Sequence, residues 1–267
     1  MRLDKAKLDL LANEIKKCGL WAKEKQNNLH VSLKEDNTPV TEVDITISRR
    51  IITLIRELFP ECALISEEEK TETVSNPPFT FVLDPIDGTD SYSQGLPSFA
   101  IALGILNSEN IPVGAIIYAP RFGKSTDDGL FLRLDPDGKI TLNGKELKII
   151  GDKKELKQIT ISSTFTQYVD SSLYKGKLRI FGSSIIHLLS PIVFPNIQAC
   201  VATPCYIWDY AASHALLLSV GMDIYNEDGT PFRYSSPFLN RNKSDGIKYA
   251  GYKETIDKLR SEIFSIK

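Results

Sequence analysis

Long apolar runs are missing from this sequence, and none approaches the ~20 residues that a membrane-spanning helix needs. The N-terminus, residues 1–5, lacks a signal-peptide pattern and leads into an amphipathic helix. These absences predict a cytoplasmic protein with no membrane partner. An excess of one charge is missing too, since 32 basic residues face 34 acidic ones, for a net charge of −2. That balance gives no electrostatic basis for binding a nucleic-acid polymer.

Cysteine and histidine are scarce, with four and three copies in 267 residues. The cysteines are Cys18, Cys62, Cys200 and Cys205. Their spacing fits no zinc signature, and the last two lie too far apart for a CxxC redox pair. We expect them to be small apolar core residues in a reducing compartment.

The rest of the composition, 42% apolar and 25% charged, is typical of a soluble globular protein and excludes disorder as the dominant state. A chain of this length buries enough surface to hold a core without disulfides or metals. One domain, or two closely packed halves that meet near Gly151, is the expected organisation.

The first half, residues 1–150, opens with two amphipathic helices. One has apolar residues at spacings of three and four from Leu8, and the other starts near Thr41 and stops at Pro60. Apolar runs of strand length follow at 62–66, 79–83, 98–106, 111–119, 130–134 and 139–142, with turn signals at 135–138 and 143–144. We predict an α+β half, in which the helices lie on an antiparallel or mixed sheet.

The second half, residues 151–267, alternates strands with helices. Strands are expected at 158–162, 178–181 and 199–203, and a hairpin at 224–233. Helices are expected at 171–175, after Gly182, at 208–220 and at 255–264. This alternation is typical of α/β structure and gives the whole chain an α/β fold class.

Acidic residues follow two of the expected strands. The run Asp84-Pro85-Ile86-Asp87-Gly88-Thr89 comes directly after 79–83, and Glu67, Glu68 and Glu69 come after 62–66. The first run puts two carboxylates on a constrained turn, with a glycine for close backbone approach and a hydroxyl beside them. A capped turn and a solvated acidic loop are the simpler interpretations of these runs.

Three further segments have both a structural and a functional interpretation. Asp44 forms a capping-box pattern with Thr41, yet it shares a helix face with apolar residues and can point inward. Asp209 opens the helix at 208–220, where the helix dipole alone favours an acid by ~0.3–1 kcal/mol. The run 182–184 (Gly-Ser-Ser) either caps the helix that it opens or presents backbone N–H groups to an anion.

If Glu67, Asp84, Asp87 and Asp209 converge, they form a strongly acidic pocket. At ~5 Å and an effective dielectric of ~20, each like-charge pair costs on the order of 3 kcal/mol, so the pocket needs divalent cations. Oxygen ligands without histidine or thiolate select Mg²⁺ over Zn²⁺. Two such ions suit hydrolysis of a phosphate ester, because they clamp the phosphate, activate a water and stabilise the leaving oxygen.

These residues resemble the motifs of the inositol monophosphatase superfamily of magnesium-dependent, lithium-sensitive phosphatases. Its pattern is an early Asp, a Glu-Glu pair after a strand, D-P-[IL]-D-[GS]-T and a late W-D-x-A-A. The matching residues follow in the same order as Asp44, Glu67-Glu68, residues 84–89 and residues 208–212. The resemblance covers most of the chain and implies a layered α-β-α-β-α sandwich.

The resemblance also implies a ligand set for two to three Mg²⁺ ions. Glu67, Asp84 and the carbonyl of Ile86 would hold the first ion. Asp84, Asp87 and Asp209 would hold the second. A third ion would be held loosely near Glu67.

Roles in water activation and substrate binding follow from the same resemblance. Asp44 and Thr89 would orient and activate the attacking water, with help from Glu67 and with Glu68 as a supporting acid. The residues expected to contact the substrate are Gly88, Thr89, Gly182, Ser183, Ser184 and Asp209.

The implied substrate is a small phosphorylated metabolite, whose class stays open. The runs 36–41 (Asp-Asn-Thr-Pro-Val-Thr) and 236–240 (Ser-Pro-Phe-Leu-Asn) resemble the 3′(2′),5′-bisphosphate nucleotidase branch. Val201 and Ala202 stand where a glutamate is expected for inositol enzymes or an arginine for the nucleotidase. An inositol monophosphate-like substrate and a bisphosphate nucleotide both stay open, as does a homodimer.

Two other classes of protein also stay open. A haloacid-dehalogenase-type phosphatase forms a phospho-aspartate on a DxDxT motif, but here two residues separate Asp84 from Asp87. The second alternative is a non-catalytic protein that keeps the fold for binding. The presence of every expected ligand argues against it.

Overall fold

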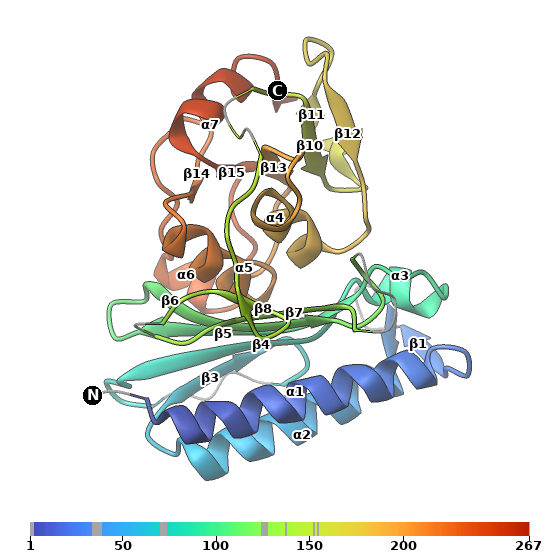
Figure 1. Ribbon diagram of the computed structural model, residues 1–267, viewed down its shortest axis with the longest axis vertical. Helices are drawn as coiled ribbons and strands as arrows, with labels where there is room; N and C mark the ends of the chain where they lie inside the picture. The colour runs from blue at the N-terminus through green and yellow to red at the C-terminus, as the bar shows by residue number, and fades with distance from the viewer. Residues whose placement is uncertain are drawn as a thin grey trace.

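Helices and sheets alternate along the long axis of the molecule in the order helix, sheet, helix, sheet, helix (Figure 1). This is the layered sandwich that the sequence predicted. The structure is a computed structural model and describes residues 3–33, 39–69, 74–123, 128–136, 138–151, 153 and 155–266. No helix in those ranges combines the length and the apolar content that crossing a membrane requires.

The first layer is a pair of long helices, α1 (Lys5–Lys25) and α2 (Glu42–Leu58), with bounds close to those expected. They bury their apolar stripes against the first sheet because residues three and four apart share a helix face. Two short antiparallel strands, β1 (Val31–Leu33) and β2 (Pro39–Thr41), lie between them and were not predicted. Residues 36–38 of the nucleotidase-like run lie outside the described ranges.

The second layer is a seven-stranded sheet in the order β3-β4-β5-β6-β7-β8-β9. Its strands are β3 (Ala63–Ser66), β4 (Phe79–Asp87), β5 (Ala100–Asn107), β6 (Pro112–Ala119), β7 (Leu130–Leu134), β8 (Thr141–Leu142) and β9 (Lys145–Glu146). Only β3 and β4 pair in parallel, and the other neighbours are antiparallel. The carboxyl ends of β3 and β4 therefore meet at one edge, which brings the two acidic runs together.

Strand β4 corrects the expectation that the acidic run follows the strand as a turn. The strand continues through Asp87, with a β-bulge between Asp84, which pairs with Ala102, and Asp87, which pairs with Ala100. Side chains three apart on a regular strand point to opposite faces. One extra residue restores the phase, so the bulge turns both carboxylates to the same side of the sheet.

The middle layer consists of α4 (Ser184–Val193) and α5 (Ile207–Ser219), which lie between the two sheets (Figure 1). Helix α5 packs closely on β5 because the residues at the contact, Gly104 and Ala211, have little or no side chain. A Cβ built on Gly104 would lie 2.7 Å from the Cβ of Ala211. This close approach fixes the start of α5, which carries Asp209, above the carboxyl end of β4.

The fourth layer is a five-stranded sheet, and α7 (Lys253–Leu259) covers its far side (Figure 1). The strands are, in order, β12 (Lys177–Arg179), β10 (Gln158–Ile161), β13 (Ala199–Ala202), β15 (Lys248–Gly251) and β14 (Asp223–Tyr225). The smaller elements of the chain are α3 (Thr89–Ser93), η1 (Phe165–Gln167), β11 (Val169–Asp170), α6 (Ser236–Leu239) and β16 (Phe264–Ser265).

Three expectations for the second half were wrong. Residues 171–175 form turns rather than a helix, because Asp170 Oδ1 accepts the Ser172 N–H and closes a local turn. Helix α7 ends at Leu259 instead of Phe264, where the chain pairs as β16 with β11. Strand β15 was missed, although it joins β13 to β14.

The two halves share one apolar core. The strands of the first sheet end at Glu146 and those of the second begin at Gln158, on either side of the predicted boundary near Gly151. The largest apolar cluster includes Ile117 of the first half and Leu189 and Leu216 of the second. Because this core joins both halves, their relative position is fixed where the acidic residues lie.

Candidate active site

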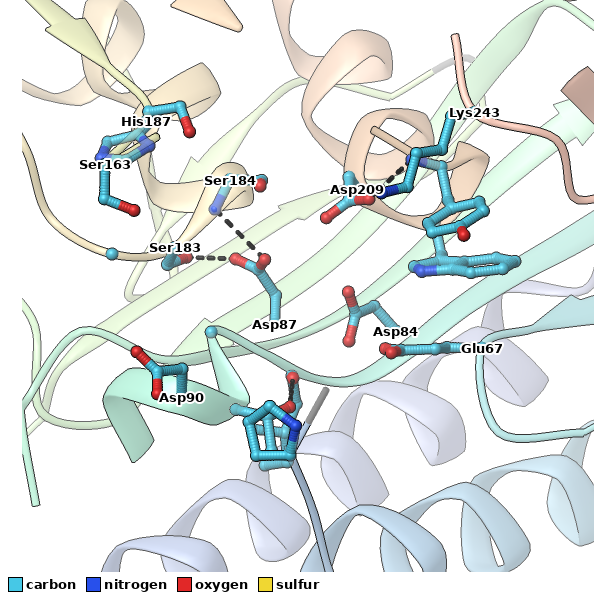
Figure 2. Close-up of a pocket in the computed structure, with 18 of the residues that line it drawn as sticks. Glu67, Asp84, Asp87, Asp90, Ser163, Ser183, Ser184, His187, Asp209 and Lys243 are labelled. Carbon is cyan, nitrogen blue, oxygen red and sulfur yellow. Dashed lines mark hydrogen bonds between the residues drawn. The ribbon is translucent and has the colours of Figure 1, made fainter. Parts of the chain in front are cut away.

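A cavity of about 450 Å³ opens between the carboxyl ends of β3 and β4 and the starts of α4 and α5 (Figure 2). Both halves of the chain contribute to its wall. The lining residues include Glu67, Asp84, Ile86, Asp87, Gly88, Thr89, Asp90, Gly182, Ser183, Ser184, His187, Tyr206, Trp208, Asp209, Arg241 and Lys243. Most of the residues that the sequence analysis selected therefore face one space.

Three aspartates form the centre of the site. Asp84, Asp87 and Asp209 each place a carboxylate oxygen within 4.8 Å of the other two. Figure 2 shows the Glu67 side chain beside Asp84 in the same cavity. Asp84 and Asp87 lie in the last four residues of β4, Glu67 follows β3, and Asp209 lies in the first turn of α5.

Burial and mutual repulsion raise the pKa values of these acids. The pKa of Asp84 rises well above its usual value, first because the carboxylate is buried and then because Glu67, Asp87 and Asp209 repel it. Burial, and then the charges of Asp87 and Glu67, raise the pKa of Asp209 to about 8. Burial raises the pKa of Asp87 to about 6 against the opposing hydrogen bonds from Ser183, Ile185 and Ser184.

The chemistry of this donor set fits hard divalent cations. Asp84 Oδ1 is buried and has no hydrogen-bond partner among the described residues. An unpaired buried carboxylate oxygen costs free energy unless a cation or a proton satisfies it. All the converging ligands are oxygens, which Mg²⁺ and Ca²⁺ prefer.

Asp87 occupies the helix start that the sequence assigned to the substrate. Its carboxylate accepts hydrogen bonds from the Ser183 hydroxyl, from Ser184 N at 3.2 Å and from Ile185 N at 2.9 Å (Figure 2). The anion at the N-terminus of α4 is thus a side chain from the first half of the chain. Ser183 also caps the helix, since its Oγ accepts the Ile186 N–H at 3.1 Å.

Asp44 both forms the predicted capping box with Thr41 and points inward. Its Oδ2 accepts the backbone N–H of Thr41 at 2.9 Å, and Thr41 caps α2 in return. Its Oδ1 lies 3.0 Å from the Thr89 hydroxyl, which is also 2.9 Å from the Ile86 carbonyl oxygen. Asp44 is fully buried, and burial raises its pKa against the hydrogen bonds from Thr41 and Thr89. The carboxylate thus holds the hydroxyl that reaches the cavity.

Gly88 permits the sharp exit from β4. Its φ is +83°, and a Cβ there would lie 2.9 Å from the carbonyl oxygens of both Gly182 and Ser98. No side chain fits without moving the backbone, so glycine is required where β4 turns into α3. The turn places Thr89 directly beside Asp87.

Several lining residues were missed by sequence reasoning. Tyr206 and Trp208 stack with ring centroids 4.7 Å apart. The Arg241 guanidinium lies 5.0 Å from the Trp208 centroid, and the Lys243 ammonium lies 5.2 Å from that of Tyr206. Val201 and Ala202 are buried in β13, and the cationic residues of the wall, Arg241 and Lys243, lie in the loop after α6. No periodicity or motif marks that loop in the sequence.

His187 supports the wall as a neutral side chain. Its Nε2 accepts the Phe181 backbone N–H at 2.7 Å, and the two rings stack with centroids 5.9 Å apart. Burial lowers the pKa of His187 to about 4. The imidazole therefore stays uncharged at neutral pH and contributes an acceptor.

We expect His187 to make the fold acid-sensitive between pH 6.5 and 4. In this pH range His187 is protonated in the unfolded chain but stays neutral in the folded chain. The free energy of unfolding therefore falls as the pH falls, by on the order of 3 kcal/mol at pH 4. His187→Gln keeps an acceptor but does not titrate. Urea unfolding at pH 7 and pH 4.5 should show a larger loss for the wild type. Equal losses would contradict this role.

The chain belongs to the inositol monophosphatase family, whose model matches residues 7–253. This is a family of metal-dependent phosphomonoesterases. Membership confirms the resemblance seen in the motifs and excludes the haloacid-dehalogenase alternative.

The names of similar proteins refer to different phosphorylated substrates. The 3′(2′),5′-bisphosphate nucleotidase CysQ of Haemophilus influenzae is 28% identical over 225 residues, which are 79% of this chain and 80% of the relative. The fructose-1,6-bisphosphatase/inositol-1-monophosphatase of Aquifex aeolicus is 28% identical over 229 residues, 80% of this chain and 81% of the relative. A solved IMPase/NADP phosphatase, complexed with NADP and Ca²⁺, has a TM-score of 0.78 at 17% identity and covers 97% and 96% of the two chains.

Proposed function

We propose that this chain is a Mg²⁺-dependent phosphomonoesterase that hydrolyses a small phosphorylated metabolite by direct attack of water. The observation that carries the proposal is the convergence of Asp84, Asp87 and Asp209 within 4.8 Å in an open cavity. Three buried carboxylates this close are stable together only with bound cations or protons. A non-catalytic protein that keeps the fold for binding is the alternative, and a phosphate-release assay distinguishes the two.

The ligand assignments are those that the family resemblance implies, and the convergence of Asp84, Asp87 and Asp209 supports the second of them. Glu67, Asp84 and the Ile86 carbonyl are proposed for one Mg²⁺, and Asp84, Asp87 and Asp209 for a second. When bound, such ions neutralise a phosphate and make a bound water more acidic. A third ion near Glu67 and inhibition by lithium belong to the same proposal. Ca²⁺ in the NADP phosphatase structure supports a hard cation.

Asp44 and Thr89 are proposed to handle the water. The Thr89 hydroxyl has one proton and two acceptors within reach, Asp44 Oδ1 and the Ile86 carbonyl. When it donates to either, its oxygen can still accept a hydrogen bond from a water in the cavity, and a proton taken from that water would have to be matched by transfer of the Thr89 proton to Asp44. Asp44 thereby orients the hydroxyl without touching the water, and Glu68 adds negative charge beside Asp44.

The substrate's phosphate is proposed to lie over Gly88 and Thr89, where the chain turns sharply beside the aspartates. Gly182 and Ser183 adjoin Gly88, and Ser184 and Asp209 line the same cavity. Because Ser183 and Ser184 bind Asp87, their contribution to the substrate is to keep that ligand in place. A 3′(2′),5′-bisphosphate nucleotide and an inositol phosphate-like substrate are both compatible with the cavity.

The proposed active site lies where the two halves of the chain meet. We propose that residues 1–150 form a half that carries most metal ligands and that residues 151–267 complete the site with Asp209. The shared apolar core supports this arrangement. A cytoplasmic location, consistent with four free cysteines, and a homodimer stay predictions.

We expect phosphate release that requires Mg²⁺ and stops in excess chelator. The assay uses purified protein, a colorimetric phosphate readout, and a panel of inositol phosphates, bisphosphate nucleotides, NADP and sugar phosphates. Addition of Mg²⁺ after the chelator should restore the rate, because the ions bind reversibly. Direct attack also predicts that acid quenching traps no phospho-enzyme.

Two outcomes would contradict the proposal. Full activity in excess chelator would reject the metal sites. No release from any substrate in the panel at saturating Mg²⁺ would count against phosphatase activity. The ranking of substrates by kcat/KM identifies the class.

A further inference from the structure

Arg241 has a left-handed backbone conformation, and its guanidinium donates to three backbone carbonyls. It follows α6, and its φ of +68° lies in the left-handed region. The N–H of Asn242 donates to the Pro237 carbonyl at 3.1 Å, and that of Arg241 to the Phe238 carbonyl at 3.3 Å. This pattern is a Schellman motif with Arg241 at the position where glycine is usual. A side chain is present despite the cost of that conformation.

The Arg241 guanidinium binds the loop that carries Glu67. Nη1 donates to the Ser66 carbonyl at 2.9 Å and to the Glu69 carbonyl, and Nη2 donates to the Glu67 carbonyl at 2.7 Å. Strand β3 is at the edge of the sheet and ends at Ser66, so its pairing with β4 does not extend to the carbonyls of Glu67 and Glu69. One planar cation from more than 170 residues away takes over that role.

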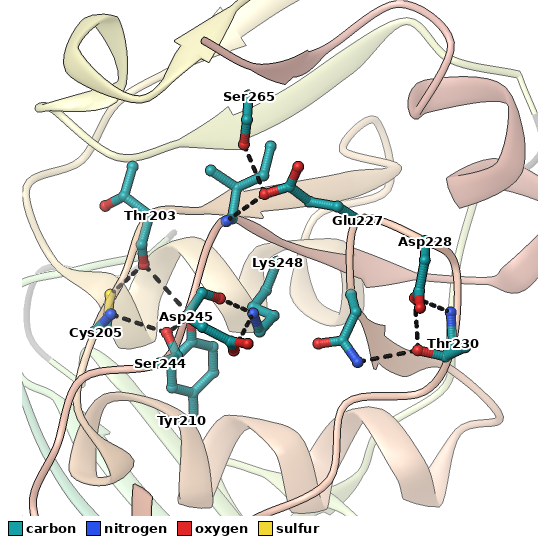
Figure 3. A network of polar contacts seen from close by, with 12 residues as sticks. Thr203, Cys205, Tyr210, Glu227, Asp228, Thr230, Ser244, Asp245, Lys248 and Ser265 are labelled. Carbon is teal, nitrogen blue, oxygen red and sulfur yellow. Dashed lines mark hydrogen bonds and ion pairs between the residues drawn. The ribbon is translucent and has the colours of Figure 1, made fainter. Parts of the chain in front are cut away.

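The backbone around Arg241 is tied to the second half of the chain. Ser244 N donates to the Cys205 carbonyl at 2.8 Å, and Cys205 N donates to Ser244 Oγ at 3.2 Å (Figure 3). Beyond it, the buried Lys248 ammonium donates to Asp245 at 3.1 Å (Figure 3). Cys205 lies two residues before α5, so the loop is fixed to the start of the element that carries Asp209.

We propose that Arg241 is a positioning residue that holds the Glu67 loop in register with the Asp209 end of the metal site. This inference rests on the proposed function, because it takes Glu67 as a metal ligand. The Glu67 backbone has a second anchor, its N–H, which donates to the Leu83 carbonyl at 3.2 Å. With Arg241 in place both backbone groups of Glu67 are fixed, one to each half of the chain.

The charge of Arg241 and its positioning role predict opposite effects on cation binding when Arg241 is replaced. A positive charge beside the site repels Mg²⁺, so its removal should tighten binding. If Arg241 instead positions Glu67, its removal should weaken binding. The sign of the change therefore separates positioning from charge.

The test uses Arg241→Gly, Arg241→Lys and the matched control Asn242→Ala, an exposed side chain on the same loop. Glycine is favoured in the left-handed conformation, so Arg241→Gly should fold. We expect both Arg241 variants to bind Mg²⁺ about tenfold more weakly in isothermal titration calorimetry and to need about tenfold more Mg²⁺ for half-maximal rate. Substrate KM at saturating Mg²⁺ should change less than ~3-fold, and Asn242→Ala should match the wild type.

Each outcome decides between the interpretations. Unchanged or tighter Mg²⁺ binding by Arg241→Gly would overturn the proposal, as would an increase in substrate KM with unchanged Mg²⁺ affinity. Wild-type Mg²⁺ affinity in Arg241→Lys would also overturn it, because the planar guanidinium would then not be needed to hold the Glu67 loop. If Mg²⁺ binding weakens in the Arg241 variants but the wild type releases no phosphate, the proposed function fails and the positioning role stands.

Discussion

Asp84→Asn should abolish activity and at the same time stabilise the metal-free fold. Asp84 is the carboxylate that both proposed Mg²⁺ sites share, so its loss removes a ligand from each. We expect kcat/KM to fall by at least ~10³-fold, about 4 kcal/mol of transition-state stabilisation. No other single substitution at the site is expected to cost more.

The stability gain has a separate physical cause. Without cations, Asp84 is buried, its Oδ1 is unpaired, and Glu67, Asp87 and Asp209 repel its charge. The folded chain must hold that charge or take up a proton at neutral pH, and unfolding relieves both costs. A neutral amide avoids them, and we expect a gain of ~1–2 kcal/mol in unfolding free energy in chelator.

Asp90→Asn is the matched control. Asp90 lines the same cavity, but its side chain is exposed. Its Oδ2 accepts a hydrogen bond from Gln94 Nε2 at 3.0 Å. Its replacement removes one negative charge without relieving burial, so stability in chelator should stay within ~0.5 kcal/mol. Urea unfolding in chelator and in Mg²⁺ measures both variants. An Asp84→Asn protein that is less stable in chelator, or that keeps a tenth of the activity, contradicts this account.

Thr89→Ala should lower kcat by about 10²–10³-fold with little change in KM, because the hydroxyl is proposed to act on the water and not on the substrate. Thr89→Ser retains the hydroxyl and should keep kcat within about tenfold. Steady-state kinetics at saturating Mg²⁺ measures both variants. A change confined to KM would show that Thr89 only binds substrate.

A double-mutant cycle tests whether Asp44 acts through Thr89. The two groups are 3.0 Å apart, and the described residues that line the cavity include Thr89 but not Asp44. Asp44→Asn in the Thr89→Ala background should therefore cost little further kcat, although it should lower stability because Asp44 also caps α2. Fully additive losses in kcat would mean that Asp44 acts independently of Thr89.

Local patterns determined much of this protein. The period of apolar residues identified α1 and α2 because helix faces repeat at short range, and Asn143-Gly144 identified a tight turn, with both residues at positive φ. The acidic runs were recognisable because strand ends and motif spacing are local properties. Together with Asp44 and Asp209, those motifs predicted the family that the comparison showed.

Contacts between distant segments decided the rest. The bulge in β4 depends on pairing with β5, so the spacing of Asp84 and Asp87 alone did not show that they share a face. Ser183 and Ser184 looked open to an anion because their partner, Asp87, lies 96 and 97 residues away. Arg241 had no local signal, since its three acceptors are backbone carbonyls at the end of another strand. The sequence determined which chemistry is present; the tertiary structure decided which groups meet, because those pairings depend on packing and not on spacing along the chain.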